Sequence, residues 1–595
     1  MKKYFYFILS IAVFSGMCSC EKEFLQKPST TGTTTIQTVF STTVNANNAI
    51  AAAYRASLIQ GLPYSGLDHG TMNSLAGELS WGYNWHETYK IVTNGENATS
   101  LMEDNYDANY SAIRQDYLVY ENIGNVSDMD ASTKSEVKGE MLGLIAYRYM
   151  GMFIRYGGVP IVTKSLSPSD NLKIPRASLQ QTEDTIISLC NQAAALLPNS
   201  WPSQWKGRLT KGAALAIKAR TLMFAARPLF NSSTPYISLG DRDSLICFMS
   251  NEPQRWQDAI TACQAVIKWA NANGYEIINT GGGGNTPDKN AFVDYATATS
   301  TPDNPEVLLA YKWDDPQYDW SYTVGYAKYF NISTYWNALG GDGYDMDNYG
   351  METNFLSYYY TAQGTNQTWP GIGNSNALPA TDYFQKMSNM EPRFLADNMP
   401  HSVNPLNNPG DQGWAAVNAD RGVNQNGSAG KGDCVSVKYY YQAGSRVWFE
   451  FPLFRMPEFY LDLAEAYNEV GNIAQSLENL NIVHNRAGLP SITATNQDSL
   501  RKAIHREWRI EFYNENQGYF LVKHWKDPNI GNGEIGGPRR EFQFTTNGGN
   551  PELPADLLTY YDQVVFNAYW SPKMFLDPFP QSEVNKGTII QNPGY

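Results

Sequence analysis

The 595-residue chain has few of the side chains on which most catalytic and nucleic-acid-binding sites depend. It contains only six histidines and six cysteines, and 44 basic residues against 58 acidic ones leave a formal net charge of -14. A broad electropositive surface for nucleic acid is therefore not expected. The G-x-S-x-G nucleophile motif and the phosphate-binding P-loop are also absent. Common nucleophilic and nucleotide-dependent enzymes are thus disfavoured, and no cofactor is expected.

Long hydrophobic runs are absent too after the N-terminal region, since none approaches the roughly 20 apolar residues of a transmembrane helix. At the N-terminus, two lysines precede an almost wholly apolar stretch that ends at Phe14, a pattern typical of a bacterial secretory signal. Cleavage needs a small residue before the cut, and Ser19 precedes Cys20. We therefore expect residues 1–19 to be the signal and Cys20 to be the mature N-terminus.

A cysteine in this position resembles the lipobox of bacterial lipoproteins, in which the thiol is acylated. Two or more acyl chains anchor a protein stably, because each buried methylene contributes about 0.8 kcal/mol. Glu21 and Glu23 resemble the acidic export signal of surface-exposed lipoproteins in some Gram-negative bacteria. The sequence therefore predicts lipidation at Cys20 and a cell-surface location. The alternative is an ordinary secreted protein with a spare thiol.

No metal site is expected from the sequence. Neither close pairing nor metal-ligand spacing is visible among the remaining mature cysteines, which are Cys190, Cys247, Cys263 and Cys434. HETYK at 86–90 begins like a zinc-protease helix, but Lys90 stands where the second histidine belongs. DMDNYG at 345–350 resembles a calcium loop, yet Tyr349 replaces an oxygen ligand and Leu356 replaces the bidentate glutamate. A solvated acidic turn is the favoured interpretation of that loop.

Several long segments are predicted to be amphipathic helices. Ser178 and Gln181 match a capping box at the start of one of them. One face of that helix carries Ile186, Cys190, Ala193 and Leu197. An alanine-rich helix is predicted from Thr210, and residues 454–490 contain two helices separated by Gly471, about the length of one tetratricopeptide-type hairpin. One face of the first of these carries Phe459, Leu463, Ala466 and Val470.

The region between the helical parts is different. Residues 275–450 are rich in Gly, Asn, Pro, Asp and aromatic residues and weak in helical periodicity. The sequence therefore predicts a mostly α fold: a scaffold of tetratricopeptide-like helical hairpins with a large, irregular, loop-rich and minor-β insertion that forms the ligand face. We expect one domain over 20–595, with the scaffold at about 40–275 and 450–530. Two independent domains are disfavoured.

Two aromatic clusters are the candidate ligand-binding features. Tyr and Trp offer a flat apolar face and a polar tip, which suits sugar rings, while neighbouring amides suit their hydroxyls. Any one of these rings could instead pack in the core. The candidate residues are Trp81, Tyr83, Asn84 and Trp85 in the first cluster, and Tyr318, Trp320, Tyr335 and Trp336 in the second.

A family resemblance runs from the lipobox almost to the C-terminus. Its segments, in chain order, are VNANNAIAAAYRASL, MLGLIAYRYMGMFIRYGGVPIVTK, GRLTKGAALAIKAR, LDLAEAYNEVG, NRAGLP and REWRIEFYNENQGYFLVKHW. In this order and spacing they resemble the SusD/RagB family of outer-membrane nutrient-binding lipoproteins. The resemblance implies four tetratricopeptide-like helix pairs and a looped ligand face. It also implies a non-enzymatic role in which the protein captures oligosaccharide above a SusC-like TonB-dependent transporter and closes over it as a lid.

The sequence departs from the family at one motif. The family usually has glutamate, glycine, any residue, arginine, tyrosine, phenylalanine and aspartate, whereas this chain has Glu515, Asn516, Gln517, Gly518, Tyr519, Phe520 and Leu521. The arginine and the aspartate are both missing, as expected if they formed one ion pair, because losing one alone would leave a buried charge unpaired. The departure puts the local packing in question.

Three other functions stay open at the sequence level. A peptide ligand would fit the same family. A secreted glycosidase needs two carboxylates about 5–10 Å apart, a separation that no sequence spacing reveals. A helical-repeat scaffold for protein assembly needs only the hairpins and makes the aromatic clusters incidental.

Overall fold

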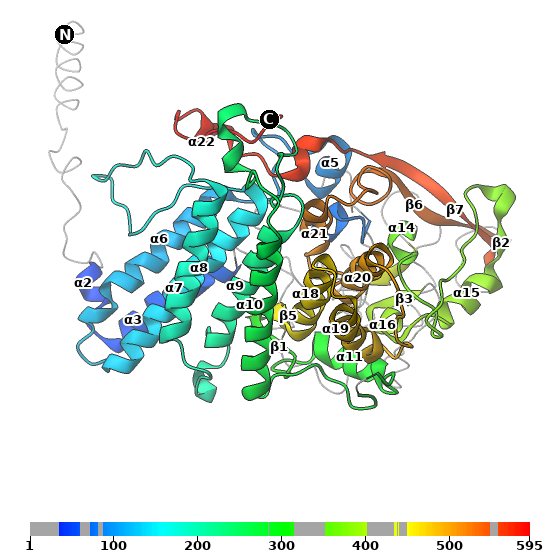
Figure 1. Ribbon diagram of the computed structural model, residues 1–595, viewed down its shortest axis with the longest axis horizontal. Coiled ribbons are helices and arrows are strands. Elements are labelled where there is room, and N and C mark those ends of the chain that lie inside the picture. Colours follow the sequence, from blue (N-terminus) through cyan, green and yellow to red (C-terminus); the bar gives the residue numbers. More distant parts are fainter. Residues whose placement is uncertain are drawn as a thin grey trace, which may run out of the picture.

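The computed structural model describes residues 35–59, 72–80, 87–283, 285–313, 351–400, 433–436, 438, 449–547 and 557–595. The prediction of a mostly helical fold with a tetratricopeptide-like scaffold is confirmed (Figure 1). The scaffold helices are α3 (Thr43–Tyr54), α6 (Tyr106–Asn122), α7 (Ala131–Tyr156), α8 (Leu179–Leu196), α9 (Lys211–Ala226), α10 (Pro253–Ala272), α18 (Met456–Glu469), α19 (Ile473–Arg486), α20 (Gln497–Glu511) and α21 (Gly518–Trp525). Contacts pair α3 with α6, α7 with α8, α9 with α10 and α18 with α19.

The chain leaves the scaffold after α10 and returns at α18, and these two helices pack against each other. The short helices in between are α11 (Ala291–Ser300), α14 (Thr353–Leu356), α15 (Ala380–Ser388) and α16 (Pro392–Asp397). The remaining short helices are α2 (Ile36–Val39), α4 (Met72–Leu75), α5 (Glu87–Asn94) and α22 (Gln581–Val584). The irregular region is therefore an elaboration between two neighbouring scaffold helices.

The described strands form three small antiparallel sheets. Strand β1 (Val307–Trp313) pairs with β5 (Phe449–Arg455), and β3 (Asn398–Pro400) pairs with β4 (Cys434–Ser436). The third sheet has the order β2-β7-β6, from β2 (Leu378–Pro379), β6 (Gly537–Thr546) and β7 (Leu557–Ala568). The long β6–β7 hairpin lies along the upper right edge in Figure 1. It follows the scaffold in sequence, in a part of the chain for which the sequence analysis proposed no element.

Local sequence signals explain where two scaffold helices begin. Ser178 Oγ accepts from the N–H of Gln181, and the Gln181 side chain accepts from the N–H of Ser178. The predicted capping box is therefore present at the N-terminus of α8. Thr210 caps α9 through the N–H of Ala213. Both interactions satisfy N–H groups that a helix start would otherwise leave without a partner.

The hairpin of α18 and α19 follows the prediction except at one residue. Phe459, Leu463 and Ala466 are buried as expected. Val470, however, was placed on the same buried face and is 40% exposed. The reason is that α18 ends one residue earlier, and the chain then turns at Gly471, whose φ of 80° favours glycine.

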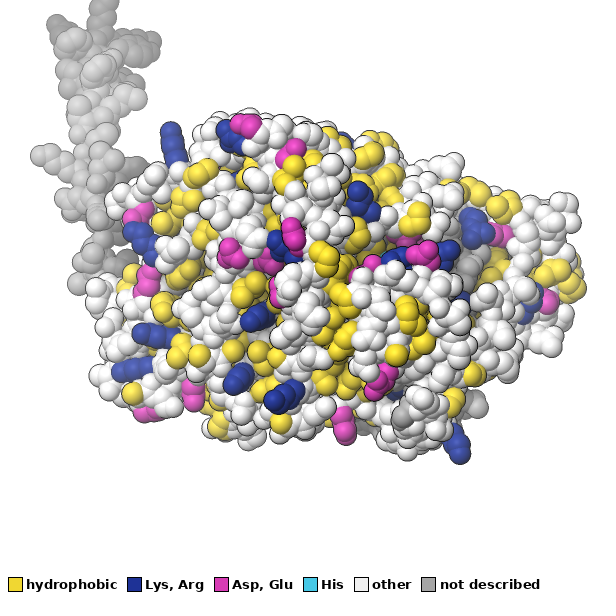
Figure 2. Space-filling model, viewed as in Figure 1, with side chains coloured by type: hydrophobic (Ala, Val, Ile, Leu, Met, Phe, Trp, Pro, Cys, Tyr) yellow, Lys and Arg dark blue, Asp and Glu magenta, His cyan; other side chains and the backbone are white. Residues whose placement is uncertain are grey.

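Within the part of the chain that the structure describes, two large hydrophobic cores support the fold, beside a small cluster around Tyr295. One runs through the scaffold helices, and the other lies beneath the irregular region and the β6–β7 hairpin. Cys190, Cys247, Cys263 and Cys434 are free and buried. None of the described helices combines the length and apolarity that crossing a bilayer requires. On the face shown in Figure 2, acidic and basic side chains are interspersed.

The motif that departs from the family pattern is well packed. A Cβ atom on Gly518 would lie 2.1 Å from Oε1 of Glu78, so a side chain at this position would require the Glu78 carboxylate to shift. Leu521, at the position of the family's aspartate, is only 1% exposed. Glu515 is retained and pairs with Arg455 at 2.7 Å. The structure thus accommodates the loss of both charged partners without a buried, unpaired charge at these two positions.

Candidate functional site

The candidate ligand residues all lie outside the described residues: Trp81, Tyr83, Asn84, Trp85, Tyr318, Trp320, Tyr335 and Trp336. The same holds for Cys20 and for the acidic loop at 345–350. Their roles stay predictions. The structure does describe the residues on either side of these segments, and their positions bear on how the segments enter and leave the folded body.

Flanking residues of three segments meet at one place. Leu79, just before the first aromatic cluster, forms an antiparallel β-bridge with Met351. The N–H of Met351 donates to the carbonyl of Cys434 at 2.9 Å, and Cys434 pairs with Pro400 between β4 and β3. Described ends of the segments 81–86, 314–350 and 401–432 are therefore adjacent to one another. Leu79, Met351 and Cys434 are each at most 1% exposed, so this meeting point is part of the second core.

Polar contacts hold this meeting point against the C-terminal hairpin. Arg539 of β6 pairs with Glu352 at 2.9 Å, and both side chains are 1% exposed. Asp433 accepts from Thr353 Oγ1 at 2.7 Å and from the N–H of Phe542 at 2.6 Å. The base from which the aromatic segments extend is therefore rigid, as is usual where binding loops are carried by a scaffold.

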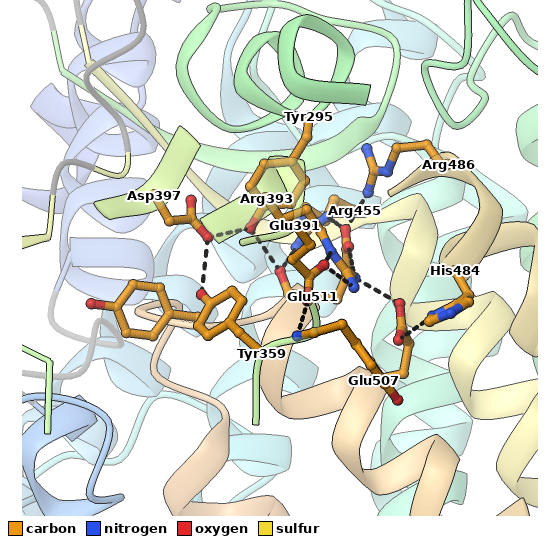
Figure 3. Close-up of polar contacts among 12 residues, drawn as sticks. Tyr295, Tyr359, Glu391, Arg393, Asp397, Arg455, His484, Arg486, Glu507 and Glu511 are labelled. Carbon is orange, nitrogen blue, oxygen red and sulfur yellow. Dashed lines mark hydrogen bonds and ion pairs between the residues drawn. The ribbon is translucent and has the colours of Figure 1, made fainter. Parts of the chain in front are cut away.

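A buried ion-pair network joins the irregular region to the scaffold (Figure 3). Arg455, the N-cap residue of α18, pairs with Glu511 at 2.6 Å and with Glu515 at 2.7 Å. Glu306, next to β1, accepts from Arg455 at 3.1 Å and from Arg486 at 3.0 Å. Arg486, the last residue of α19, also pairs with Glu511. Each of these side chains is at most 4% exposed, so the network lies in the interior.

The network continues to α16. Arg393 pairs with Glu507 at 2.6 Å and with Glu511 at 3.0 Å, and these two glutamates lie one turn apart on α20. Glu391 accepts from Arg393 Nε at 2.8 Å, and His484 Nδ1 lies 2.8 Å from Glu507. Arginines from the scaffold and from the irregular region thus pair with glutamates on the same face of α20.

The third part of the network centres on Tyr295 in α11. Its hydroxyl donates to Asp397 at 2.8 Å and accepts from Lys438 at 2.9 Å. Lys438 also pairs with Glu515 at 2.7 Å. Burial raises the pKa of Asp397 to about 7, against the opposing effect of Lys438. This carboxyl is therefore partly protonated near neutral pH.

The arginines keep the central glutamates charged. Burial opposes the ionisation of Glu507, but Arg393 and His484 outweigh it and lower its pKa to about 2. Burial also opposes the ionisation of Glu511, yet Arg486, Arg455 and Arg393 hold its pKa below the ordinary value. Because the network is buried, a substrate does not reach these charges, and their role is to position α11, α16 and β1 on the scaffold. Among the described residues, no group of three or more His, Cys, Asp or Glu side chains is suited to a metal ion.

In the described ranges of the chain, burial raises the pKa of several buried carboxyls strongly. For four of them the pKa reaches about 7 (Glu78 and Asp397) or about 8 (Glu96 and Glu534). In the unfolded chain such groups titrate near pH 4. The folded protein therefore holds more protons than the unfolded chain between about pH 4 and 8. Protonation of these carboxyls thus stabilises the folded state at low pH, and this contribution to the free energy of unfolding is lost as the pH rises through the folded pKa values. Two histidines, the buried His524 and the half-buried His505, have lowered pKa values and act in the opposite direction mainly below pH 6.5.

We therefore predict that the free energy of unfolding is lower at pH 8.5 than at pH 6.5 by about 2 kcal/mol or more, measured by urea denaturation. Glu96→Gln should reduce this difference, because a glutamine amide does not titrate. Its amide oxygen can still accept the hydrogen bond from the Tyr519 hydroxyl, which lies 3.1 Å from Glu96. Glu276→Gln, at an exposed position, is the matched control and should leave the pH dependence unchanged. Equal or greater stability at pH 8.5 would contradict the prediction.

Structure also shows an aromatic residue that the sequence analysis did not select. Trp205, in a short 3-10 turn between α8 and α9, is 38% exposed. The sequence signal was modest: WPSQWKGR has two tryptophans, but it lacks the density of aromatic and amide residues seen in the two predicted clusters. Burial of individual side chains in such a connection is decided by the elements packed around it.

Comparisons with known proteins come from profiles and from solved structures. A profile described as the SusD family matches residues 305–595, and a profile described as starch-binding associating with outer membrane matches residues 23–223. A search of the curated proteins found no match to this chain. The two matched ranges cover most of the chain and leave the stretch between them unmatched.

Solved structures share the fold over nearly the whole chain. A SusD-like protein from Bacteroides fragilis is 23% identical, with a TM-score of 0.74, over 96% of this chain and 100% of that one. A SusD-like carbohydrate binding protein from Bacteroides fragilis is 17% identical, with a TM-score of 0.66, over 93% of this chain and 99% of that one. A laminarin binding SusD-like protein is 17% identical, with a TM-score of 0.53, over 93% of this chain and 100% of that one.

Proposed function

Since the chain belongs to the SusD/RagB family, we propose that it is a surface-exposed outer-membrane lipoprotein that binds oligosaccharide or polysaccharide. It delivers this ligand to a SusC-like TonB-dependent transporter, for which it acts as the lid. The observation that carries the proposal is the match of two family profiles to residues 23–223 and 305–595. Two structural relatives are described as carbohydrate binding and laminarin binding, which favours a glycan over a peptide.

The ligand site in this proposal is formed by the two aromatic clusters. Its residues are Trp81, Tyr83, Asn84 and Trp85 with Tyr318, Trp320, Tyr335 and Trp336. The β-bridge between Leu79 and Met351 supports a common site, because it joins described residues that flank both clusters. In such a site the rings stack on sugar faces, the amides bond hydroxyls, and the rigid base lowers the entropy lost on binding.

Affinity electrophoresis against a panel of polysaccharides tests the binding function. Retarded migration in a gel that contains one glycan, and normal migration in the others, is the expected result. Prolonged incubation with the retained glycan should then return it unchanged by chromatography, since the protein is proposed not to be an enzyme. Products that persist after repurification and disappear on mutation of a single carboxylate would assign the protein to the glycosidases instead.

Lipid anchoring is tested at Cys20. We predict that Cys20→Ala leaves the fold intact and releases the protein from membranes, because the acyl chains would be the anchor. Fractionation in a strain without the partner transporter, followed by a high-salt wash, measures this release. Cys18→Ala is the control and should stay in the membrane fraction, since that residue would leave with the signal. Retention of the Cys20 variant in the membrane fraction would contradict the prediction.

A further inference from the structure

Trp205 is 38% exposed, and a cation lies over its ring. The guanidinium of Arg208 lies 5.0 Å from the centroid of the Trp205 ring and 4.3 Å from that of Trp201. Trp201 itself is fixed by its indole N–H, which donates to the carbonyl of Leu209 at 2.8 Å. The exposed ring is therefore supported by a stacked cation and does not depend on a ligand for its position.

Arg208 in turn is anchored in the core. Its Nε donates to Glu140 of α7 at 2.6 Å, and a second nitrogen pairs with the other carboxylate oxygen. Glu140 is fully buried and also accepts from the hydroxyl of Tyr54 in α3. This chain of contacts fixes an exposed aromatic at the end of the helical bundle. A pre-positioned ring loses little entropy when a ligand stacks on it.

Charged side chains lie in and next to the turn that carries Trp205. Lys206 Nζ lies 3.2 Å from Asp303 Oδ2, and Lys312 pairs with the other carboxylate oxygen. The two lysine side chains are 57% and 25% exposed, and that of Asp303 is 30% exposed. A carboxylate accepts about four hydrogen bonds and an ammonium donates three, so Asp303 and Lys206 can still bond hydroxyls. Asp303 is fixed as well, because its N–H donates to Glu450 at 2.6 Å.

The turn also lies beside the strand that leads toward the second aromatic cluster. A Cβ atom on Gly207 would lie 2.9 Å from two side-chain carbons of Lys312, so the turn and this strand are in direct contact. Lys312 and Trp313 are the last residues of β1, and the segment 314–350 follows directly. A ligand that reaches from this segment onto the scaffold would meet the turn.

We propose that Trp205 forms a further sugar-binding subsite, in which its exposed face stacks on one sugar ring while Asp303 and Lys206 bond the hydroxyls. The proposal rests on the proposed function and adds a contact on the scaffold to the two aromatic clusters. A protein partner is disfavoured, because a stable interface buries about 800 Å² on each side and is apolar at its centre. One indole face among charged side chains matches a single sugar ring instead.

The test compares Trp205→Ala, Trp205→Phe and wild type by isothermal titration with the polysaccharide that the wild type retains. Trp205→Ala is expected to weaken binding about three- to tenfold, and Trp205→Phe is expected to keep most of the affinity. The matched control is Tyr569→Ala, since Tyr569 is 37% exposed and lies in the connection after β7. This control should bind like the wild type, and all variants should melt within a few degrees of it.

A second measurement follows the wild-type protein itself and uses a variant only to assign one resonance. Protein labelled with 5-fluorotryptophan gives one fluorine resonance for each tryptophan, and Trp205→Phe identifies the resonance of Trp205. That resonance is expected to shift when the polysaccharide is added. An unshifted resonance, or unchanged affinity in Trp205→Ala while the wild type binds, would overturn the subsite and leave the proposed function standing. Failure of the wild type to bind any glycan would overturn both.

Discussion

A protein that carries both Trp85→Ala and Trp320→Ala is expected to bind its preferred glycan too weakly to detect, while each single variant binds several-fold more weakly than the wild type. Stacking on one aromatic face contributes on the order of 1 kcal/mol, which is about a fivefold change in affinity. Two rings that face the same ligand are coupled, so their joint loss should equal or exceed the sum of the single losses. Isothermal titration against the retained polysaccharide measures all three affinities.

Two controls separate ligand contact from core packing. Trp85→Phe keeps an aromatic face and should retain most of the affinity. If Trp85 packed in the core instead, the smaller Phe side chain would lower the stability of the protein. The double variant should melt close to the wild type if the two rings contact ligand, because rings outside the core contribute little to folding. Near-normal affinity in the double variant would refute the common site. Weak binding together with a melting temperature lowered by many degrees would show that these tryptophans are core residues.

Arg455→Met is expected to destabilise the protein by about 3 to 5 kcal/mol, because it leaves buried carboxylates without their main counter-charge. Arg455 pairs with Glu306, Glu511 and Glu515, and all four side chains are at most 4% exposed. Urea denaturation measures the loss. The variant should also bind glycan more weakly, since the network holds β1 and α16 on the scaffold, and the segment 314–350 follows β1 directly.

The matched control is an arginine on the surface. Arg501 pairs with Glu469 at 2.7 Å, but 34% of its side chain is exposed, so Arg501→Met should cost less than about 1 kcal/mol. The double variant Arg455→Met with Glu515→Gln should be less destabilised than the sum of its single changes, because removing both partners leaves less unpaired charge. Similar costs for Arg455→Met and Arg501→Met would show that the buried network contributes no more than a surface ion pair.

Short-range signals in the sequence were sufficient for the scaffold helices. The Ser178 capping box, the Thr210 cap and the turn at Gly471 each involve residues a few positions apart, and the structure contains all three. The error at Val470 came from a boundary, since periodicity does not say at which residue a helix ends. The β6–β7 hairpin had no prediction at all. Its strands carry an irregular burial pattern, including charged residues that are buried through partners elsewhere in the chain.

The sequence by itself determined the fold class, the family and the segments that carry aromatic residues, because periodicity, caps and motifs are properties of neighbouring residues. Only the tertiary structure decided which distant residues meet. Arg393, Arg455 and Arg486 look like ordinary charged residues in the sequence, yet the packing of α16, α18 and α19 brings them to one face of α20. In the same way, packing joins Leu79 to Met351 and leaves Trp205 exposed. The physical reason is that burial and ion pairing over long sequence separations depend on how all the helices pack together, and no local pattern encodes that arrangement.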